Sequence, residues 1–114
     1  MDIENTFENL EKIAEQNFDK AEFEKQIFDF VNQLDKIWDI LRLASLVRWA
    51  QYENENDAIE IALDISDRAI EKAVESNNKA DLETIIDELE MSMELEERAD
   101  EVRKILNNLE RKKL

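Results

Sequence analysis

The stretch Ile37–Tyr52, which reads IWDILRLASLVRWAQY, holds both tryptophans and the only tyrosine of the chain. Its apolar residues fall on nearly every side of a helical wheel. A helix that is apolar all round is expected to be buried on several faces. We therefore expect this stretch to lie in the central core helix, with Trp38 and Leu41 deeply buried.

The composition of the whole chain predicts an all-α fold. The 114 residues include no glycine and no proline, and 39% of them are charged while 43% are hydrophobic. The chain is thus rich in strong helix formers and lacks the two main helix breakers. Its length suits one core, so we expect a single helical domain over residues 1–114.

The absent residue types exclude several chemistries. Without cysteine there are no disulfides or thiolates, and without histidine the commonest catalytic base and transition-metal ligand are missing. Paired carboxylates such as Asp87–Glu88, Glu96–Glu97 and Asp100–Glu101 are typical of a solvated acidic face, since no neighbour that would perturb a pKa can be named. We expect no enzyme, and no catalytic, cofactor, metal or small-molecule site.

Two metal motifs can be tested directly against the sequence. Di-iron helical bundles need a Glu-x-x-His pair from two helices, and the chain has no histidine. The acidic turn at residues 54–57 lacks the alternating ligands, the glycine and the closing glutamate of an EF-hand. Only weak, non-specific binding of divalent cations to the acidic residues 81–101 stays open.

The charge balance argues against nucleic acid and membranes. Thirty acidic residues against fifteen basic ones give a formal net charge of −15, which repels phosphate backbones and anionic lipids. Residues 1–8 lack the basic start and apolar run of a signal peptide. Residues 37–52 are too short and too charged to cross a bilayer core of about 30 Å. We expect a soluble protein, cytoplasmic in an expression host, whose natural compartment is unknown.

Hydrophobic periodicity divides the chain into four helices. Their expected ranges are 3–16, 20–52, 56–76 and 79–111. Asn17 can adopt a left-handed turn conformation, Asp19 can cap the second helix, and Asn56 or Asp57 can cap the third. These elements predict an irregular antiparallel four-helix bundle, or five helices if the last one breaks near Ser92.

Two helices carry apolar faces that indicate partners. The third has an alanine stripe, which allows close approach of a neighbour and predicts packing against the tryptophan stretch; its members are Ala58, Ala62, Ala69 and Ala73. The fourth changes its apolar face between Glu90 and Glu94, and its second half has no obvious partner within the chain. We therefore expect self-association, as a homodimer.

Short echoes within the sequence indicate related helical hairpins. Residues 10–17, LEKIAEQN, resemble residues 70–77, IEKAVESN, and residues 20–24 resemble residues 79–83. The turn at residues 17–21, NFDKA, resembles the turn into the second helix of tetratricopeptide repeats. Because the family's glycines and proline are missing and its period of about 34 residues is not kept, the resemblance implies hairpin geometry and no peptide-binding groove.

Three features of the tryptophan stretch could belong to a site. Trp38 and Trp49 lie three helical turns apart, on one side, which suits either core packing, the favoured interpretation, or an aromatic box for a ligand. Ser45 has no basic partner at a readable spacing, so we expect its hydroxyl to bond a carbonyl four residues earlier. Arg42 and Arg48 are expected to snorkel or to pair with acids of the third helix.

Two classes of function fit these features. The lack of glycine, proline, cysteine and histidine resembles computationally designed helical proteins, especially those assembled from natural hairpins. That resemblance implies a structural bundle with no evolved activity, whose purpose is its fold. The alternative is a natural acidic protein-interaction module, which in one form imitates a nucleic-acid backbone and blocks a basic partner.

Overall fold

The computed structural model describes residues 2–111, and within them the chain is all-helical. Six α-helices follow one another, and a short π-helical segment, Glu88–Ser92, joins the fifth to the sixth. The helices are α1 (Ile3–Ala14), α2 (Lys20–Val31), α3 (Ile37–Arg48), α4 (Glu55–Glu75), α5 (Lys79–Asp87) and α6 (Glu96–Arg111). The all-α prediction is confirmed, whereas the count of four helices is not.

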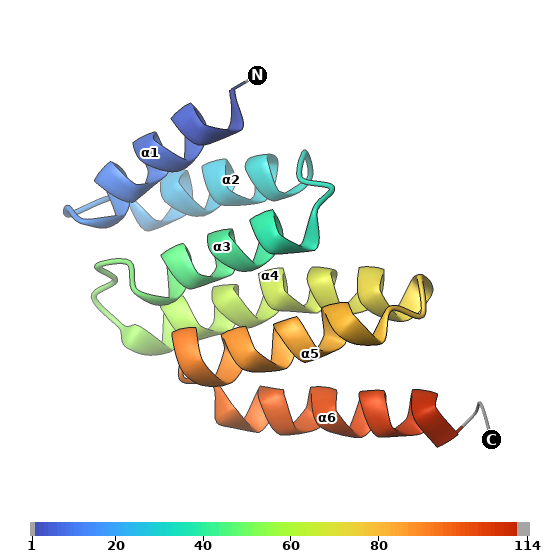
Figure 1. Cartoon of the computed structure of the whole chain (residues 1–114). Coiled ribbons are helices and arrows are strands. Elements are labelled where there is room, and N and C mark those ends of the chain that lie inside the picture. The colour runs from blue at the N-terminus through green and yellow to red at the C-terminus, as the bar shows by residue number, and fades with distance from the viewer. Residues whose placement is uncertain (1, 112–114) are drawn as a thin grey trace.

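The helices form antiparallel hairpins stacked along one direction (Figure 1). The helices α1, α3 and α5 lie on the side nearer the viewer, with α2 and α4 behind them, and the two ends of the chain lie at opposite ends of the stack. The first two hairpins are regularly spaced: α3 begins at Ile37, 34 residues after α1 begins at Ile3, and α4 begins 35 residues after α2. The arrangement is a layered stack and not a bundle around one axis.

The predicted second helix is wrong, because it is two helices separated by a turn at residues 32–36. The amides of Gln33 and Leu34 each donate to a carbonyl three residues earlier, which tightens and ends α2. Leu34 in the turn is itself buried, so the apolar period runs on through the turn. Because no glycine or proline marks the turn, the sequence pattern predicts a continuous helix there.

The expected break near Ser92 is confirmed. The amide of Met93 donates to the carbonyl of Glu88 across a π-helical turn, and the amide of Leu95 donates to the carbonyl of Leu89 at 2.7 Å. Glu94, between them, has a φ of 56°, a left-handed conformation that a residue with a side chain adopts only at a cost. The chain thus leaves α5 and enters α6 through a tightly bonded, strained corner.

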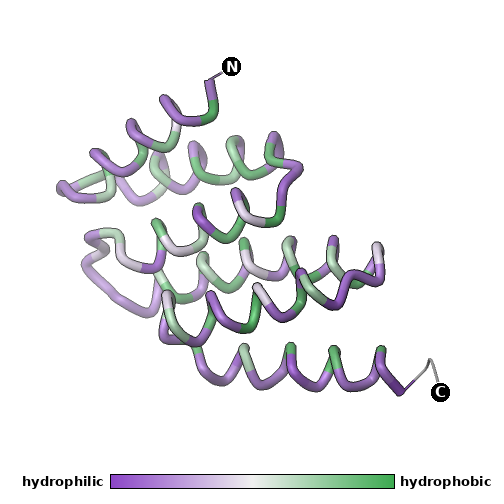
Figure 2. The backbone as a smooth tube through the Cα atoms, in the orientation of Figure 1, coloured by the Kyte–Doolittle hydropathy of each residue, from purple (hydrophilic) through white to green (hydrophobic). Residues whose placement is uncertain are grey.

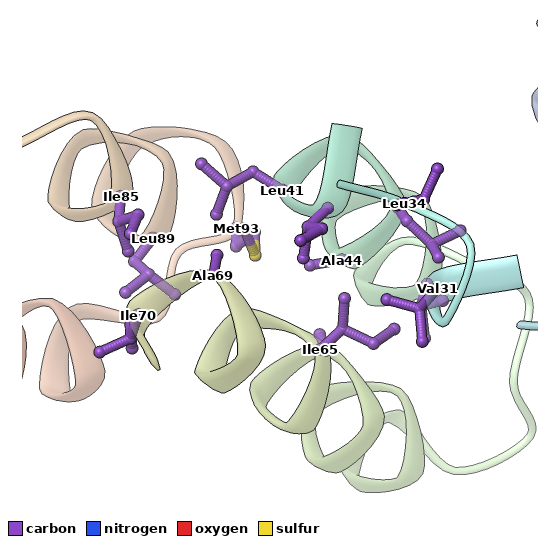
Figure 3. Close-up of a cluster of buried hydrophobic side chains, with 14 of the residues drawn as sticks. Val31, Leu34, Leu41, Ala44, Ile65, Ala69, Ile70, Ile85, Leu89 and Met93 are labelled. Atoms are coloured by element: carbon purple, nitrogen blue, oxygen red, sulfur yellow. The ribbon is translucent and has the colours of Figure 1, made fainter. Parts of the chain in front are cut away.

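The predicted packing of α3 against the alanine stripe is confirmed. The α3–α4 contact is the most extensive between any two helices of residues 2–111. All four alanines of the stripe are buried, and so is Leu41, as predicted. Figure 3 shows Met93 at the centre of this core, between Leu41 and Ala44 of α3 and Ala69 of α4. Close approach at small residues is what permits so extensive a contact.

The prediction that Trp38 is deeply buried is wrong, because its side chain is 59% exposed. Since α3 begins at Ile37, Trp38 lies in the first turn of a separate helix and not in the middle of a long one. The neighbouring helices cover the side of α3 that carries Ile40, Leu43 and Val47, which are fully buried. Trp38 is on a different side.

The second half of the last predicted helix does have a partner within the chain. Ala99 and Val102 of α6 are buried, and Leu106 and Leu109 are partly buried against the core. In Figure 2 the hydrophobic residues of α6 lie along the edge that faces α5. Self-association was predicted from an apolar face without a partner, and in the structure that face packs within the chain.

The caps were predicted in part. Asp19 caps α2, as expected, by accepting from the amide of Glu22. The cap of α4 is Asn54, which accepts from the amide of Asn56, and neither Asn56 nor Asp57 has that role. The left-handed asparagine is Asn77, with a φ of 52°, and not Asn17. No helix among the described residues is both long and apolar enough to cross a bilayer.

Candidate functional site

The paired carboxylates are spread over the surface. Glu96 and Glu97 are exposed, and Asp100 and Glu101 form ion pairs with Arg103 and Arg98, respectively. Among residues 2–111, no group of three or more acidic side chains is arranged to hold a metal ion. These carboxylates therefore form a charged surface, and their arrangement does not suggest acid–base chemistry.

A groove of about 630 Å³ runs along α3. One wall comes from the end of α1, and Glu88, the first residue of the π-helical segment directly after α5, lines the other side. The lining residues are Glu11, Ala14, Glu15, Trp38, Leu41, Arg42, Ser45, Leu46, Trp49 and Glu88. Five of them from α3, together with Trp49 directly after it, follow the spacing i, i+3, i+4, i+7, i+8, i+11, so they form one continuous stripe. We call this site the Trp groove.

Trp49 is a fixed wall of the Trp groove. Its indole Nε1 donates to the carbonyl of Ser92 at 2.8 Å, which ties the end of α3 to the π-helical segment. The guanidinium of Arg48 lies 4.3 Å from the centre of the indole ring. With its polar atom bonded and one neighbour stacked on it, the ring is held in place although 48% of the residue is exposed.

Arg48 anchors this wall from the buried side. It is only 7% exposed, its Nε donates to the carbonyl of Met93 at 2.9 Å, and its Nη1 lies 3.2 Å from a carboxylate oxygen of Glu55. Burial of a charged group is tolerated when it is paired and hydrogen-bonded, as it is here. Arg48 thus pairs with Glu55, the first residue of α4 and one residue before the start predicted for the third helix, which agrees with one of its two expectations.

Of the two expectations for Arg42, pairing with the third predicted helix is wrong. It pairs with Glu4 at 2.6 Å and with Glu11 at 3.5 Å, both on α1 and neither on the third predicted helix. Its guanidinium also lies 4.1 Å from the centre of the Phe7 ring. The hydrogen bond to Glu4 and the charges of both carboxylates raise the pKa of Arg42, so the group is permanently charged and fully engaged with α1.

The expected hydrogen bond of Ser45 is not formed. In the part of the chain that the structure describes, the Ser45 hydroxyl makes no hydrogen bond to a backbone carbonyl, although Ser66, Ser76 and Thr84 each bond a carbonyl four residues earlier. Ser45 is half-buried and lines the Trp groove. It is a polar group on the floor of the site.

The rim of the Trp groove is acidic. Glu15 directly after α1 is exposed and Glu88 directly after α5 is half-buried, and within residues 2–111 neither forms an ion pair. Arg42, the only base among the lining residues, is already paired with α1. The site therefore combines aromatic surface with carboxylates whose charge is free to attract a cation.

Two further pKa shifts lie outside the Trp groove, at Tyr52 and Asp67. Burial and the nearby carboxylate of Glu24 raise the pKa of the Tyr52 hydroxyl. Burial also raises the pKa of Asp67, against the opposing charge of Arg98. Both residues are held by structural contacts, the first in an aromatic cluster with Phe18 and Phe23 and the second in an ion pair. Neither shift marks a reactive centre.

Comparisons with protein-family models, with curated proteins and with solved structures gave no match for this chain.

Proposed function

We propose that the chain is a non-catalytic, acidic protein-interaction module that recognises a basic partner. The single observation that carries this proposal is the Trp groove, in which two substantially exposed tryptophans lie beside carboxylates on one face of the helix stack. Exposed aromatic side chains gathered in a concave surface are typical of binding sites. The net charge of −15 favours a cationic partner and speeds its encounter.

The spacing of the helices is a further support. The helix α3 begins 34 residues after α1, and α4 begins 35 residues after α2. For these two hairpins the expectation that the tetratricopeptide period of about 34 residues is not kept is therefore corrected. Stacked hairpins of this kind offer extended surfaces for protein partners.

The proposal is tested by titrating the chain into two fluorescent ten-residue peptides, one of alternating Lys and Ala and one of alternating Glu and Ala. We expect anisotropy to rise only with the basic peptide, and the affinity to fall as salt is raised, because charge attraction is screened. Binding to neither peptide would contradict the proposal. If the carboxylates also imitate nucleic acid, the chain will displace duplex DNA from the basic peptide.

A designed fold without evolved activity is the second proposal, and the absence of glycine and proline favours it. It predicts cooperative, very stable unfolding that does not depend on any ligand. The left-handed Glu94 and the π-helical segment depart from the idealised geometry of such designs. Self-association stays a prediction too, and a strictly monomeric species by light scattering at tens of micromolar would rule it out.

A further inference from the structure

We infer that the Trp groove takes an extended peptide segment whose lysine or arginine side chains lie over Trp38 and beside Glu15 and Glu88. This inference rests on the proposed function and specifies its binding site. Trp38 and Trp49 are eleven residues apart along α3, which corresponds to about 16 Å at 1.5 Å per residue. An extended peptide covers that distance with about five residues.

Trp38 is the side chain best placed to bind a cation. It is 59% exposed and also borders a second hollow, where three acids, Asp35, Glu75 and Asp81, lie together with two bases, Lys36 and Lys72. A cation over an indole face is attracted by the ring quadrupole, and tryptophan is the strongest of the aromatic residues in this role. Trp49 is already stacked on Arg48 and bonded to Ser92, so it offers a rigid wall for the peptide.

The carboxylates of the Trp groove determine which sign of charge the ligand carries. Arg42 is held by Glu4 and Glu11, so it does not neutralise Glu15 or Glu88 across the site. An anionic peptide or a nucleic acid would meet two unpaired carboxylates there. A basic peptide would place its charges next to them and over the Trp38 ring.

A second copy of this chain is a poorer occupant. A symmetric dimer through the Trp groove would bring Glu15 and Glu88 of one copy to the same surface of the other. Like charges brought together at an interface oppose association, and each copy already has a net charge of −15. Charge complementarity therefore favours a basic peptide.

The experiment uses the full chain and the labelled Lys–Ala peptide at an ionic strength of about 0.15 M, where the Debye length is about 8 Å. Trp38→Leu keeps an apolar side chain but removes the ring, and we expect the affinity to fall about tenfold. Trp38→Phe keeps a π face and should recover part of that loss. The double variant Glu15→Gln/Glu88→Gln should also bind about tenfold more weakly.

The matched control is Glu60→Gln/Glu71→Gln, which removes the same charge from exposed positions of α4 outside the Trp groove. We expect it to bind within about twofold of the unaltered chain, because distant exposed charges are screened. Since Trp38 is largely exposed, its variants should keep the thermal unfolding of the parent, which shows that they fold.

The outcomes separate the two proposals. If the unaltered chain binds the basic peptide and the Trp38 and Glu15/Glu88 variants bind it equally well, this inference is wrong and the proposed function stands. If the control variant loses as much affinity as the Glu15/Glu88 variant, recognition is by overall charge and the inference is also wrong. If light scattering shows a dimer that Trp38→Leu abolishes, the occupant is a second copy.

Discussion

Two sides of α3 both carry large apolar side chains but have opposite surroundings. One side carries Ile40, Leu43, Ala44 and Val47, all fully buried and packed largely against α4. The other forms the floor of the Trp groove and carries two tryptophans that are each about half exposed. The same kind of residue thus serves as core on one side and as open surface on the other.

The difference lies in the neighbours. The helix α4 is 21 residues long and presents small alanines, so it can lie close along the whole of α3. On the opposite side the walls are the end of α1 and Glu88 directly after α5, which leave the space between them open. A helix that is apolar all round therefore indicates either burial on every side or one side kept open for a partner.

The largest expected difference in the free energy of unfolding is between substitutions at Leu41 and Trp38, which lie three residues apart. Leu41→Ala removes a side chain that is 1% exposed and should lower the free energy of unfolding by about 2–5 kcal/mol. Trp38→Ala removes a larger side chain from the same stripe but should cost less than about 1 kcal/mol, because that side chain is mostly in water. Urea denaturation measures both, and equal losses would contradict the distinction.

The two arginines of α3 give the next largest contrast. Arg48→Met keeps much of the packing but leaves the carbonyl of Met93 without its donor, which should cost about 1.5–3 kcal/mol. Arg42→Met removes ion pairs that are largely in solvent and should cost about 0–1 kcal/mol. Thermal unfolding of the two variants, side by side, checks the order; a reversal would show that Arg48 is not an anchor.

The smallest expected effect separates the two tryptophans. Trp49→Phe removes the indole N–H that bonds the carbonyl of Ser92 and should cost about 0.5–1.5 kcal/mol. Trp38→Phe should change the free energy of unfolding by less than about 0.5 kcal/mol. Chemical denaturation in triplicate resolves the pair, and an unchanged Trp49→Phe variant would show that Trp49 does not hold the π-helical segment.

Much of the fold could be predicted because hydrophobic periodicity and capping residues indicate where helices lie. The apolar positions of residues 3–14 and 55–75 gave α1 and α4 nearly to their ends, and the change of apolar face gave the break between α5 and α6. The break between α2 and α3 was missed because Leu34 fills the core from within the turn. A turn that keeps the helical period has no hydrophobic signal of its own.

The candidate site was harder to predict than the fold. Trp38 and Trp49 were placed on one side of a helix correctly, and an aromatic box was one of two interpretations, but burial was favoured. The sequence cannot show that α1 and α5 stand apart at α3, because that depends on how three separate hairpins stack. The one available signal was the alternation of Trp38, Arg42, Ser45 and Trp49, which puts polar groups into the apolar stripe.

Because the two tryptophans have different surroundings, their intrinsic fluorescence can report on two different parts of the structure. Trp49 is tied to Ser92, so its emission reports whether the end of α3 still touches the corner between α5 and α6. Trp38 stands mostly in water, so its emission changes when something covers it. A chain with only one of the two indoles left would follow either the integrity of that corner or the filling of the Trp groove by itself.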